Sequence, residues 1–171
     1  GEAYFNGSFE GNGHTITNLN LTPKGSDYGF FRYIGESGMV KGLAISGVIE
    51  PSGSQENIGG IAGVNYGTIT NCSFAGEVHG INSVGAVAGI NRGTGNIISC
   101  SSNALVLATN YTGGIAGTNE GIVSACTSVS SVNIEELEPT LDLAGMDVSS
   151  FNVTQNVVNR NDMGGIVGYS S

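Results

Sequence analysis

The feature that most constrains the fold of this chain is a glycine-rich pentapeptide that returns at near-regular intervals. The motif Gly-Gly-Ile-Ala-Gly at residues 59–63 recurs with small changes at 85–89, 113–117 and 164–168. Successive copies start 26, 28 and 51 residues apart, and the last spacing is close to two periods. A unit of this size cannot bury its own apolar face, whereas stacked units share one continuous core. The sequence therefore predicts a solenoid.

Each of the first three copies leads into a turn signal and further short β-rich segments. Asn-x-Gly follows at residues 65–67, 91–93 and 119–121, and both Asn and Gly tolerate the positive φ of a tight turn. Beyond the turn, residues 15–21 match residues 68–74 position for position. This match predicts that the two segments occupy equivalent places in different units.

Two apolar columns run through the units and predict where the core lies. One column holds Ile16, Val40, Ile69, Ile97 and Val123, and the other holds Leu19, Leu43, Cys72, Cys100 and Cys126. The columns are three residues apart, so a straight strand would point them to opposite faces. A bend near Asn18 and Asn71, where Asn accepts the left-handed conformation, would turn both columns inward. A third β-rich piece follows in each unit, as at residues 77–79 and 105–107.

These elements together predict an all-β fold, a parallel β-helix of about five to six coils with three short strands in each. Neighbouring coils are expected to lie about 4.8 Å apart. The 29 glycines, the absence of Trp and the low charged fraction of 11% are unlike an ordinary helical enzyme. A β-propeller fits less well, because one blade needs about 40 to 50 residues.

Residues 9–19, followed by the serial pentapeptide, Asn-x-Gly and Cys units, resemble the GLUG-motif repeats of secreted and surface-anchored bacterial proteins. Those proteins include adhesin-like proteins and the non-catalytic regions of IgA peptidases. The resemblance covers residues 4–134 and again 163–168. It implies a right-handed β-helix outside the cell, and it implies no catalytic residue.

Composition narrows the partners of the chain. Its net charge of −9 opposes binding to nucleic acid or to anionic lipid, and no run reaches 18 consecutive apolar residues. We therefore expect no nucleic-acid partner, no membrane insertion and no cofactor. Because repeat patterns reach both ends, residues 1–171 are expected to form a single β-helix segment of a larger exported protein with adjacent domains.

The three cysteines, Cys72, Cys100 and Cys126, share one repeat column and are predicted to form a buried file of free thiols. In-register stacking keeps their Cβ atoms parallel at about 4.8 Å. A disulfide needs about 3.5 to 4.5 Å and converging side chains, and the ligands of a metal must converge as well. One strained disulfide and a metal site stay open as less favoured alternatives.

Signals for catalysis are weak. The only imidazoles, His14 and His79, lie in different parts of the repeat without a triad pattern, and we interpret them as solvated or locally bonded. Residues 11–13 are interpreted as a tight turn rather than a phosphate loop, because no Gly-Lys-Ser/Thr follows. Enzymes do occur on β-helices, so a polysaccharide lyase or glycoside hydrolase stays as an alternative. Glycoside hydrolysis needs paired carboxylates, and no such cluster is evident.

The repeat motifs cannot be recognised between residues 135 and 162. We interpret this segment as a partly ordered excursion, with a degenerate coil as the alternative, and long irregular segments of this kind are often functional. It carries Glu135, Glu136, Glu138, Asp142 and Asp147. These acids could bind Ca²⁺, although a solvated acidic loop is favoured because the spacing of a calcium loop is missing.

The patterns favour a non-catalytic extracellular module of a bacterial surface protein that serves cell adhesion. The candidate ligand-binding residues are Tyr66, Arg92 and Glu120 at the turns, together with the five acidic residues of the irregular segment. The expected partner is a glycan or a host surface protein. A passive spacer or stalk, stiffened by repetition, is the alternative.

Overall fold

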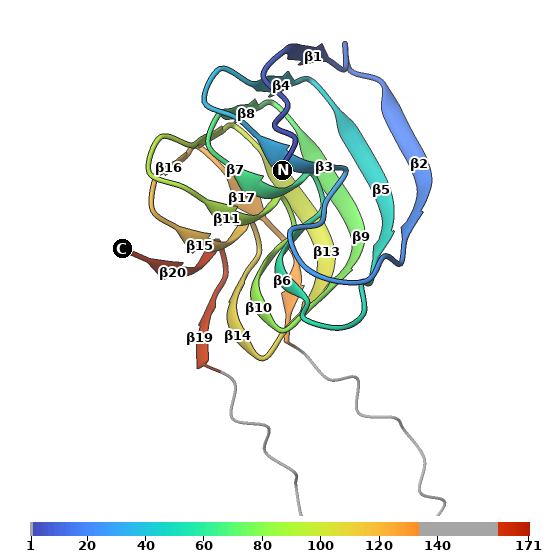
Figure 1. Ribbon diagram of the computed structural model, residues 1–171, viewed down its shortest axis with the longest axis vertical. Coiled ribbons are helices and arrows are strands. Elements are labelled where there is room, and N and C mark those ends of the chain that lie inside the picture. Colours follow the sequence, from blue (N-terminus) through green and yellow to red (C-terminus); the bar gives the residue numbers. More distant parts are fainter. Residues whose placement is uncertain (1, 134–160) are drawn as a thin grey trace, which may run out of the picture.

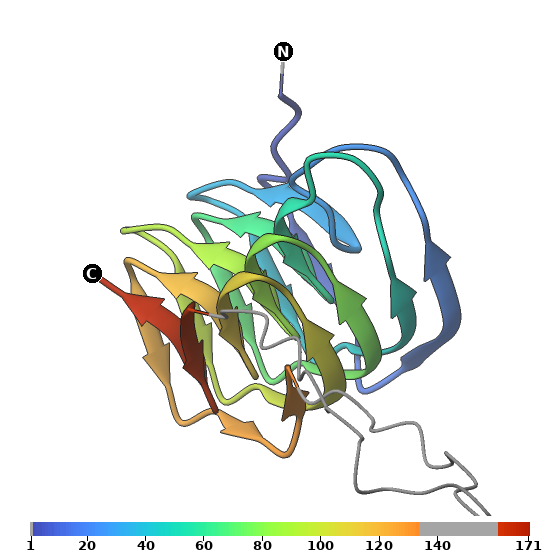
Figure 2. The ribbon, with the colours of Figure 1, turned by 90° about the horizontal axis from the view of Figure 1, so that it is seen from below.

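The computed structural model describes residues 2–133 and 161–171 of the chain. Regular structure in these residues consists of β-strands, and every pair of neighbouring strands is parallel. Figures 1 and 2 show the strands stacked in successive rungs of a solenoid of about four turns. The predicted all-β parallel β-helix is confirmed.

A regular coil contains four strands. The first complete one consists of β6 (Glu56–Gly59), β7 (Ala62–Asn65), β8 (Thr68–Thr70) and β9 (Ser73–His79). The prediction of three strands per coil is wrong, because Gly60 and Ile61 bend the chain inside the pentapeptide and divide it between two strands. The predicted third piece is the second half of β9, and so it is not a separate strand.

The next two coils repeat this order. The second coil consists of β10 (Asn82–Gly85), β11 (Ala88–Asn91), β12 (Asn96–Ile98) and β13 (Ser101–Leu107). The third consists of β14 (Asn110–Gly113), β15 (Ala116–Asn119), β16 (Ile122–Ser124), β17 (Thr127–Ser128) and β18 (Ser131–Val132). Both β17 and β18 pair with β13.

The outer coils are less complete. The chain begins with β1 (Ser8–Glu10), β2 (Thr15–Leu21), β3 (Phe31–Ile34), β4 (Met39–Lys41) and β5 (Ala44–Ile49), and ends with β19 (Asn161–Gly164) and β20 (Val167–Ser170). β1 and β2 extend two of the four sheets, and β19 and β20 extend the other two. These half coils explain why the predicted count of five to six coils was slightly too high. Asn161 and Asp162, predicted to be irregular, already belong to β19.

The strand order defines four walls. Two of them follow the orders β1-β4-β8-β12-β16 and β17-β13-β9-β5-β2. Strands β2, β5, β9 and β13 of the latter lie side by side in the right half of Figure 1. The other two follow β19-β14-β10-β6 and β20-β15-β11-β7-β3. Like segments of successive repeats therefore lie side by side, as the spacing of the motifs requires.

The register confirms the main apolar column and corrects its start. Val40, Ile69, Ile97 and Val123 pair in successive rungs, and the first three are fully buried. In the first coil Phe9, not Ile16, pairs with Val40.

The alignment of residues 15–21 with 68–74 is therefore wrong. Ile16 pairs with Ile45 instead, and Leu19 pairs with Gly47. The turn at Asn12 and Gly13 puts two more residues into this corner than the corresponding corner between β4 and β5 contains. The turn itself is confirmed, since the His14 N–H donates to the Gly11 carbonyl oxygen at 2.8 Å.

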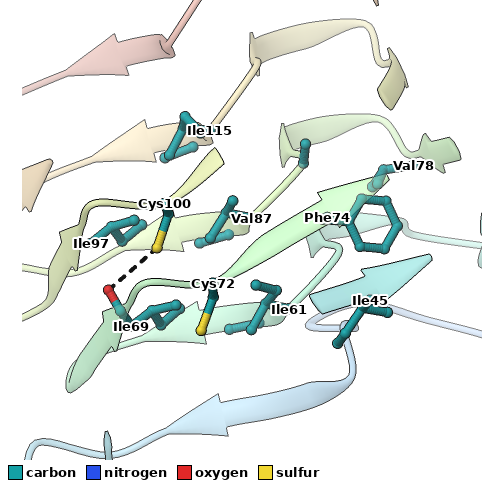
Figure 3. Close-up of a cluster of buried hydrophobic side chains, with 14 of the residues drawn as sticks. Ile45, Ile61, Ile69, Cys72, Phe74, Val78, Val87, Ile97, Cys100 and Ile115 are labelled. Atoms are coloured by element: carbon teal, nitrogen blue, oxygen red, sulfur yellow. Dashed lines mark hydrogen bonds between the residues drawn. The ribbon is translucent and has the colours of Figure 1, made fainter. Parts of the chain in front are cut away.

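The predicted bend between the two apolar columns is present. Asn71 has a φ of 51°, and the equivalent Ser99 and Ala125 have φ values of 53° and 51°. Left-handed backbone at this point turns the following strand, so that residues three apart in sequence face the same interior. Figure 3 shows the result, with Ile69 and Cys72 on one rung and Ile97 and Cys100 on the next.

The glycines of the pentapeptide let two neighbouring walls of the solenoid pack closely together. A Cβ on Gly59 would lie 2.7 Å from the Cα of Ala88, and a Cβ on Gly89 would overlap the backbone of Asn57 and Ile58. The β6 strand of one coil and the β11 strand of the next thus pack backbone against backbone. The pentapeptide glycines thus permit the close approach of these two backbones.

Candidate functional site

The corner that follows β7, β11 and β15 is held by a ladder of asparagines. The Nδ2 of Asn65 donates to the Oδ1 of Asn91 at 2.7 Å, and the Nδ2 of Asn91 donates to the Oδ1 of Asn119 at 2.8 Å. All three side chains are buried. Because each amide also bonds to its own turn, as the Asn65 Nδ2 does to the Gly67 carbonyl oxygen, the ladder fixes the direction of the next residue in every coil.

The candidate residues Tyr66, Arg92 and Glu120 are these next residues, one in each of three successive coils. The Arg92 Nη1 lies 2.8 Å from the Glu120 Oε1, and both side chains are about one-third exposed (36% and 34%). An ion pair of this exposure is worth about 0.2 to 1 kcal/mol. Arg92 and Glu120 therefore neutralise each other.

Tyr66 lies instead in a cluster of three tyrosines. Its ring centroid is 5.9 Å from that of Tyr4 with an interplanar angle of 64°, and the Tyr4 ring lies 5.3 Å from the Tyr33 ring at 46°. Tyr4 is exposed and Tyr33 is buried. The rings thus form a tilted cluster in which Tyr33 is buried, Tyr66 is half-buried against it and Tyr4 is exposed.

A groove of about 550 Å³ opens beside these rings. We call it the tyrosine groove, and its lining consists of Tyr4, Asn6, Gly35, Glu36, Ser37 and Tyr66. These residues come from the segment before β1, from the corner between β3 and β4 and from the corner after β7. Three separate segments of the chain therefore build one concave surface.

Hydrogen bonds hold the rings behind the groove. The Tyr33 hydroxyl donates to the Asp27 Oδ2 at 2.7 Å, and the Asn57 Nδ2 donates to the other oxygen of the same carboxylate at 2.7 Å. Burial, followed by the bond to Asp27, raises the pKa of Tyr33 well above its usual value. The Tyr4 hydroxyl donates to the Glu2 Oε2 at 2.6 Å, which raises the pKa of Tyr4 to about 12. Both phenols are therefore neutral at physiological pH.

The polar groups around the tyrosine groove are acidic or neutral. Glu36 belongs to the lining, and the Glu2 carboxylate lies within 3.5 Å of the Tyr33 hydroxyl. Among the lining residues there is no Lys or Arg. An aromatic corner with amide, hydroxyl and carboxylate groups suits a polar ligand that has apolar faces, since tyrosine rings pack against such faces and the polar groups bond its edges.

A second, smaller pocket of about 300 Å³ lies on the opposite part of the coil. It is lined by Glu50, Pro51, Gln55, His79, Gly80, Leu107, Ala108 and Thr109. The His79 Nδ1 is 3.6 Å from Glu50 Oε1 and its Nε2 is 3.2 Å from Glu77 Oε2. His79 thus lies between two carboxylates, although its buried Nε2 has no hydrogen-bond partner within the described residues. Across residues 2–133 and 161–171, no three His, Cys, Asp or Glu side chains are grouped to hold a metal ion.

The cysteine column forms the predicted file of free thiols. Cys72 and Cys100 are buried, whereas Cys126 is half-buried, so the prediction of burial holds for two of the three. The Cys100 Sγ donates to the Ile69 carbonyl oxygen at 3.6 Å, shown dashed in Figure 3. Hydrogen bonds with Cys126 and Cys72, together with burial, raise the pKa of Cys100. This thiol therefore packs as a small apolar side chain.

Sequence reasoning found one groove residue and missed the others. Tyr66 was predicted, Arg92 and Glu120 pair with each other outside the lining, and the predicted acids Glu135, Glu136, Glu138, Asp142 and Asp147 lie outside the described residues. The missed residues Glu36 and Ser37 sit in a corner that has two more residues than the corner after β7. The corner after β11 is equally long, so corner length alone does not single out Glu36 and Ser37. Tyr4 and Asn6 lie before the first strand and have no counterpart in other coils.

The fold and the tyrosine groove together define a parallel β-solenoid with a groove near its N-terminal end. Comparisons with known proteins match the repeat of this solenoid. Residues 54–78, from just before β6 into β9, match the family model of the GLUG motif. The resemblance found in the sequence is thereby confirmed.

Two relatives match longer stretches. Halomucin of Haloquadratum walsbyi is 34% identical over 86 residues, which is 50% of this chain and 1% of halomucin. A putative Gly-rich membrane protein of Evansella cellulosilytica is 38% identical over 71 residues, which is 40% of this chain and 8% of that protein. The chain thus spans a small part of these relatives. No solved structure matches it.

One of the two relatives is named as a membrane protein, so the described residues were searched for a membrane-spanning helix. In the part of the chain that the structure describes, no helix is long and apolar enough to cross a bilayer.

Proposed function

We propose that this chain is a β-helix module of a cell-surface protein and that it binds a glycan through the tyrosine groove. The observation that carries the proposal is the meeting of two angled tyrosine rings, the exposed Tyr4 and the half-buried Tyr66, with amide, hydroxyl and carboxylate groups in one groove. Support for a surface location comes from the match to the GLUG motif and from relatives named halomucin and Gly-rich membrane protein.

The proposed binding mode follows from the lining. The apolar face of a sugar ring packs on Tyr66 or Tyr4, and its hydroxyls bond to Asn6 and Ser37. A contact of this kind is worth about 1 kcal/mol beyond the area that it buries, so one site binds weakly. Many copies on a surface would raise the overall affinity through avidity.

The proposal is binding without catalysis. Glycoside hydrolysis uses two carboxylates on opposite sides of the scissile bond, whereas the lining of the tyrosine groove includes one, Glu36. Turnover of any polysaccharide by the purified chain would contradict this part of the proposal.

A glycan array followed by calorimetry on the best ligand tests the function. Tyr4→Ala is expected to weaken binding by about tenfold or more, which is about 1.4 kcal/mol. The matched control is Tyr169→Ala, because Tyr169 is similarly exposed (44% against 41%) and its ring contacts Tyr111 rather than the groove. Equal loss in both variants, or no loss in Tyr4→Ala, would contradict a site at this groove.

The irregular segment has its own test. Deletion of residues 135–158 removes the five predicted acidic residues. If circular dichroism shows that the β-structure survives while binding disappears, then this segment contributes to recognition. Full binding after the deletion would remove the segment from the proposed site.

The second candidate function is a passive spacer. It is favoured by the in-register asparagine ladder and the continuous core, which join consecutive coils with hydrogen bonds and apolar contacts. Absence of any ligand on a broad array, with the fold intact, is the result that this function predicts.

A further inference from the structure

We infer that the tyrosine groove prefers sugars that carry a free amine, such as glucosamine units, over neutral and acidic sugars. This inference rests on the proposed glycan-binding function and adds the chemical class of the ligand. It is carried by the charge of the groove and by the arrangement of its rings.

The charge of the groove favours a cationic ligand. Glu36 lies in the lining, and Glu2 lies next to it through its bond to the Tyr4 hydroxyl. No Lys or Arg belongs to the lining, and the guanidinium of Arg92, in the coil after Tyr66, is held by Glu120 at 2.8 Å. Carboxylates without a paired cation attract an ammonium group and repel a sugar carboxylate or sulfate. The net charge of −9 acts in the same direction.

The rings offer an aromatic surface to a cation. Tyr4 and Tyr66 form an edge-to-face pair, with centroids 5.9 Å apart and an interplanar angle of 64°. Both rings line the groove and the Tyr4 ring is exposed, so a cation bound in the groove can contact the Tyr4 ring. Such cation–π contacts are worth about 0.5 to 2 kcal/mol, depending on solvent exposure. The phenols stay protonated, because the bond to Glu2 raises the pKa of Tyr4 to about 12. The rings therefore do not compete with Glu36 as anions.

The chain already shows this chemistry next to the groove. The guanidinium carbon of Arg32 lies 4.5 Å from the Tyr28 ring centroid and 5.5 Å from that of Tyr33. Arg32 is thus a cation held near two tyrosine rings, one of which, Tyr33, contacts Tyr4. Within the described residues no Lys or Arg makes such a contact with Tyr4 or Tyr66. A ligand ammonium group would contact the Tyr4 ring in the same way.

The size of the groove fits a sugar unit. A volume of about 550 Å³ falls in the range of about 300 to 1,000 Å³ that is usual for small-ligand sites. An amino sugar offers a ring face for Tyr66, hydroxyls for Asn6 and Ser37, and an ammonium group for Glu36. N-acetylation removes the charge and leaves the other contacts in place.

The test compares two oligosaccharides of equal length that differ only in acetylation, namely oligomers of glucosamine and of N-acetylglucosamine. Calorimetry in mildly acidic buffer, in which sugar amines are protonated, is expected to show at least tenfold tighter binding of the free amine. Because the added contact is ionic, the preference should shrink as NaCl is raised.

Two isosteric variants locate the effect. Glu36→Gln should bring the two affinities close to parity, chiefly by weakening the binding of the free-amine oligomer. Glu77→Gln changes the net charge equally but lies outside the groove lining, beside His79, and it should keep the preference.

The outcomes separate this inference from the function on which it rests. Equal affinity for the two oligomers, or tighter binding of the acetylated or of an acidic oligomer, overturns the preference for amines while glycan binding stands. Loss of the preference in both variants also overturns it, because the overall charge would then be the cause. Absence of binding to every oligomer and every array glycan would instead overturn the proposed function.

Discussion

The three regular coils differ in packing from the N-terminal end of the solenoid, where Tyr4, Tyr33 and Tyr66 meet beside the tyrosine groove. We call this second region the tyrosine corner. In the regular coils many buried residues lie on their own kind, as Ile69 does under Ile97 and Asn65 does beside Asn91. At the tyrosine corner unlike groups meet, as where the Tyr33 hydroxyl donates to the Asp27 carboxylate. Stacking like on like satisfies each group within the column. The broken pattern leaves rings and polar groups facing solvent, where a ligand can reach them.

The asparagine column shows where the stacking of like residues ends and the tyrosine corner begins. Its members pair in the order Ile34, Asn65, Asn91, Asn119 and Ser170 from the first rung to the last. The amide ladder therefore ends at Ile34, next to Gly35 of the groove lining. The corner that follows Ile34 holds Glu36 and Ser37; it is longer than the corner after Asn65 and as long as the corner after Asn91.

The pentapeptide glycines of the regular coils, which let neighbouring coils pack backbone against backbone, leave no room for a side chain. Substitution of one of them should therefore have the largest effect on the stability of the regular coils. Gly89→Ala places a methyl group against the backbone of Asn57 and Ile58, which cannot move without separating two strands. We expect a loss of about 3 kcal/mol in the free energy of unfolding, at the upper end for overpacking. Urea denaturation followed by circular dichroism measures it.

The control for this change lies four residues further along. A Cβ on Gly93 has nothing within 4 Å, and this glycine has no positive φ. Gly93→Ala should stay within about 0.5 kcal/mol of the parent chain. Equal behaviour of the two variants would show that the regular coils tolerate side chains in the wall and would remove the contrast with the tyrosine corner.

The asparagine ladder should give the intermediate effect. Asn91→Ala leaves the Asn65 amide without its acceptor and the Asn119 carbonyl oxygen without its donor, in a place with no exposed surface. We expect a loss of about 2 kcal/mol, because buried unpaired polar groups cost about 1 to 3 kcal/mol.

Asn119→Ala at the far end of the ladder breaks one inter-asparagine bond instead of two, and its loss should be about half as large. The same denaturation experiment compares the two variants. A ladder whose middle and end members cost the same would contradict the view that stacking of like residues carries the stability of these coils.

The smallest expected effect concerns Tyr33 at the tyrosine corner, which should make the free energy of unfolding depend on pH in the alkaline range. Burial and the bond to Asp27 raise the pKa of Tyr33 above its value in the unfolded chain. The unfolded state therefore loses the proton first, and the stability contributed below a pH of about 10 is lost as the pH rises further.

Tyr33→Phe removes this term, so the difference in unfolding free energy between the parent chain and the variant should narrow above that pH. Thermal melts of both chains in alkaline buffers check it, and comparison within the pair cancels the ionisation of the thiols. A constant difference at all pH values would mean that Tyr33 has no raised pKa in the folded state.

Repetition made most of the coil predictable. The apolar file from Val40 to Val123, the bend at Asn71 and the free thiols of Cys72 and Cys100 all follow from columns that are visible in the sequence. The errors came where the coil length changes. Ile16 was assigned to the wrong column because two extra residues at Asn12 and Gly13 shift β2, and matching residue types concealed the shift.

The tyrosine groove was only partly predictable for a related reason. Tyr66 stood out because it occupies a repeat position where Arg92 and Glu120 follow. Tyr4 and Asn6 precede the first strand and have no counterpart in other coils, so no column indicates their place. Their position depends on the isolated bridge between Phe5 and Ile34, which brings the N-terminal segment onto the corner.

The period of the glycine motif and the columns of Ile, Asn and Cys determined by themselves that this chain stacks into a β-helix. Each coil needs its neighbour to bury the same apolar positions, and that demand is written in the local pattern. Only the tertiary structure decided that the pentapeptide divides between two strands and that Tyr4, Glu36 and Tyr66 share a groove. Those contacts join segments outside the repeat, and their geometry depends on the length of each corner rather than on residue type.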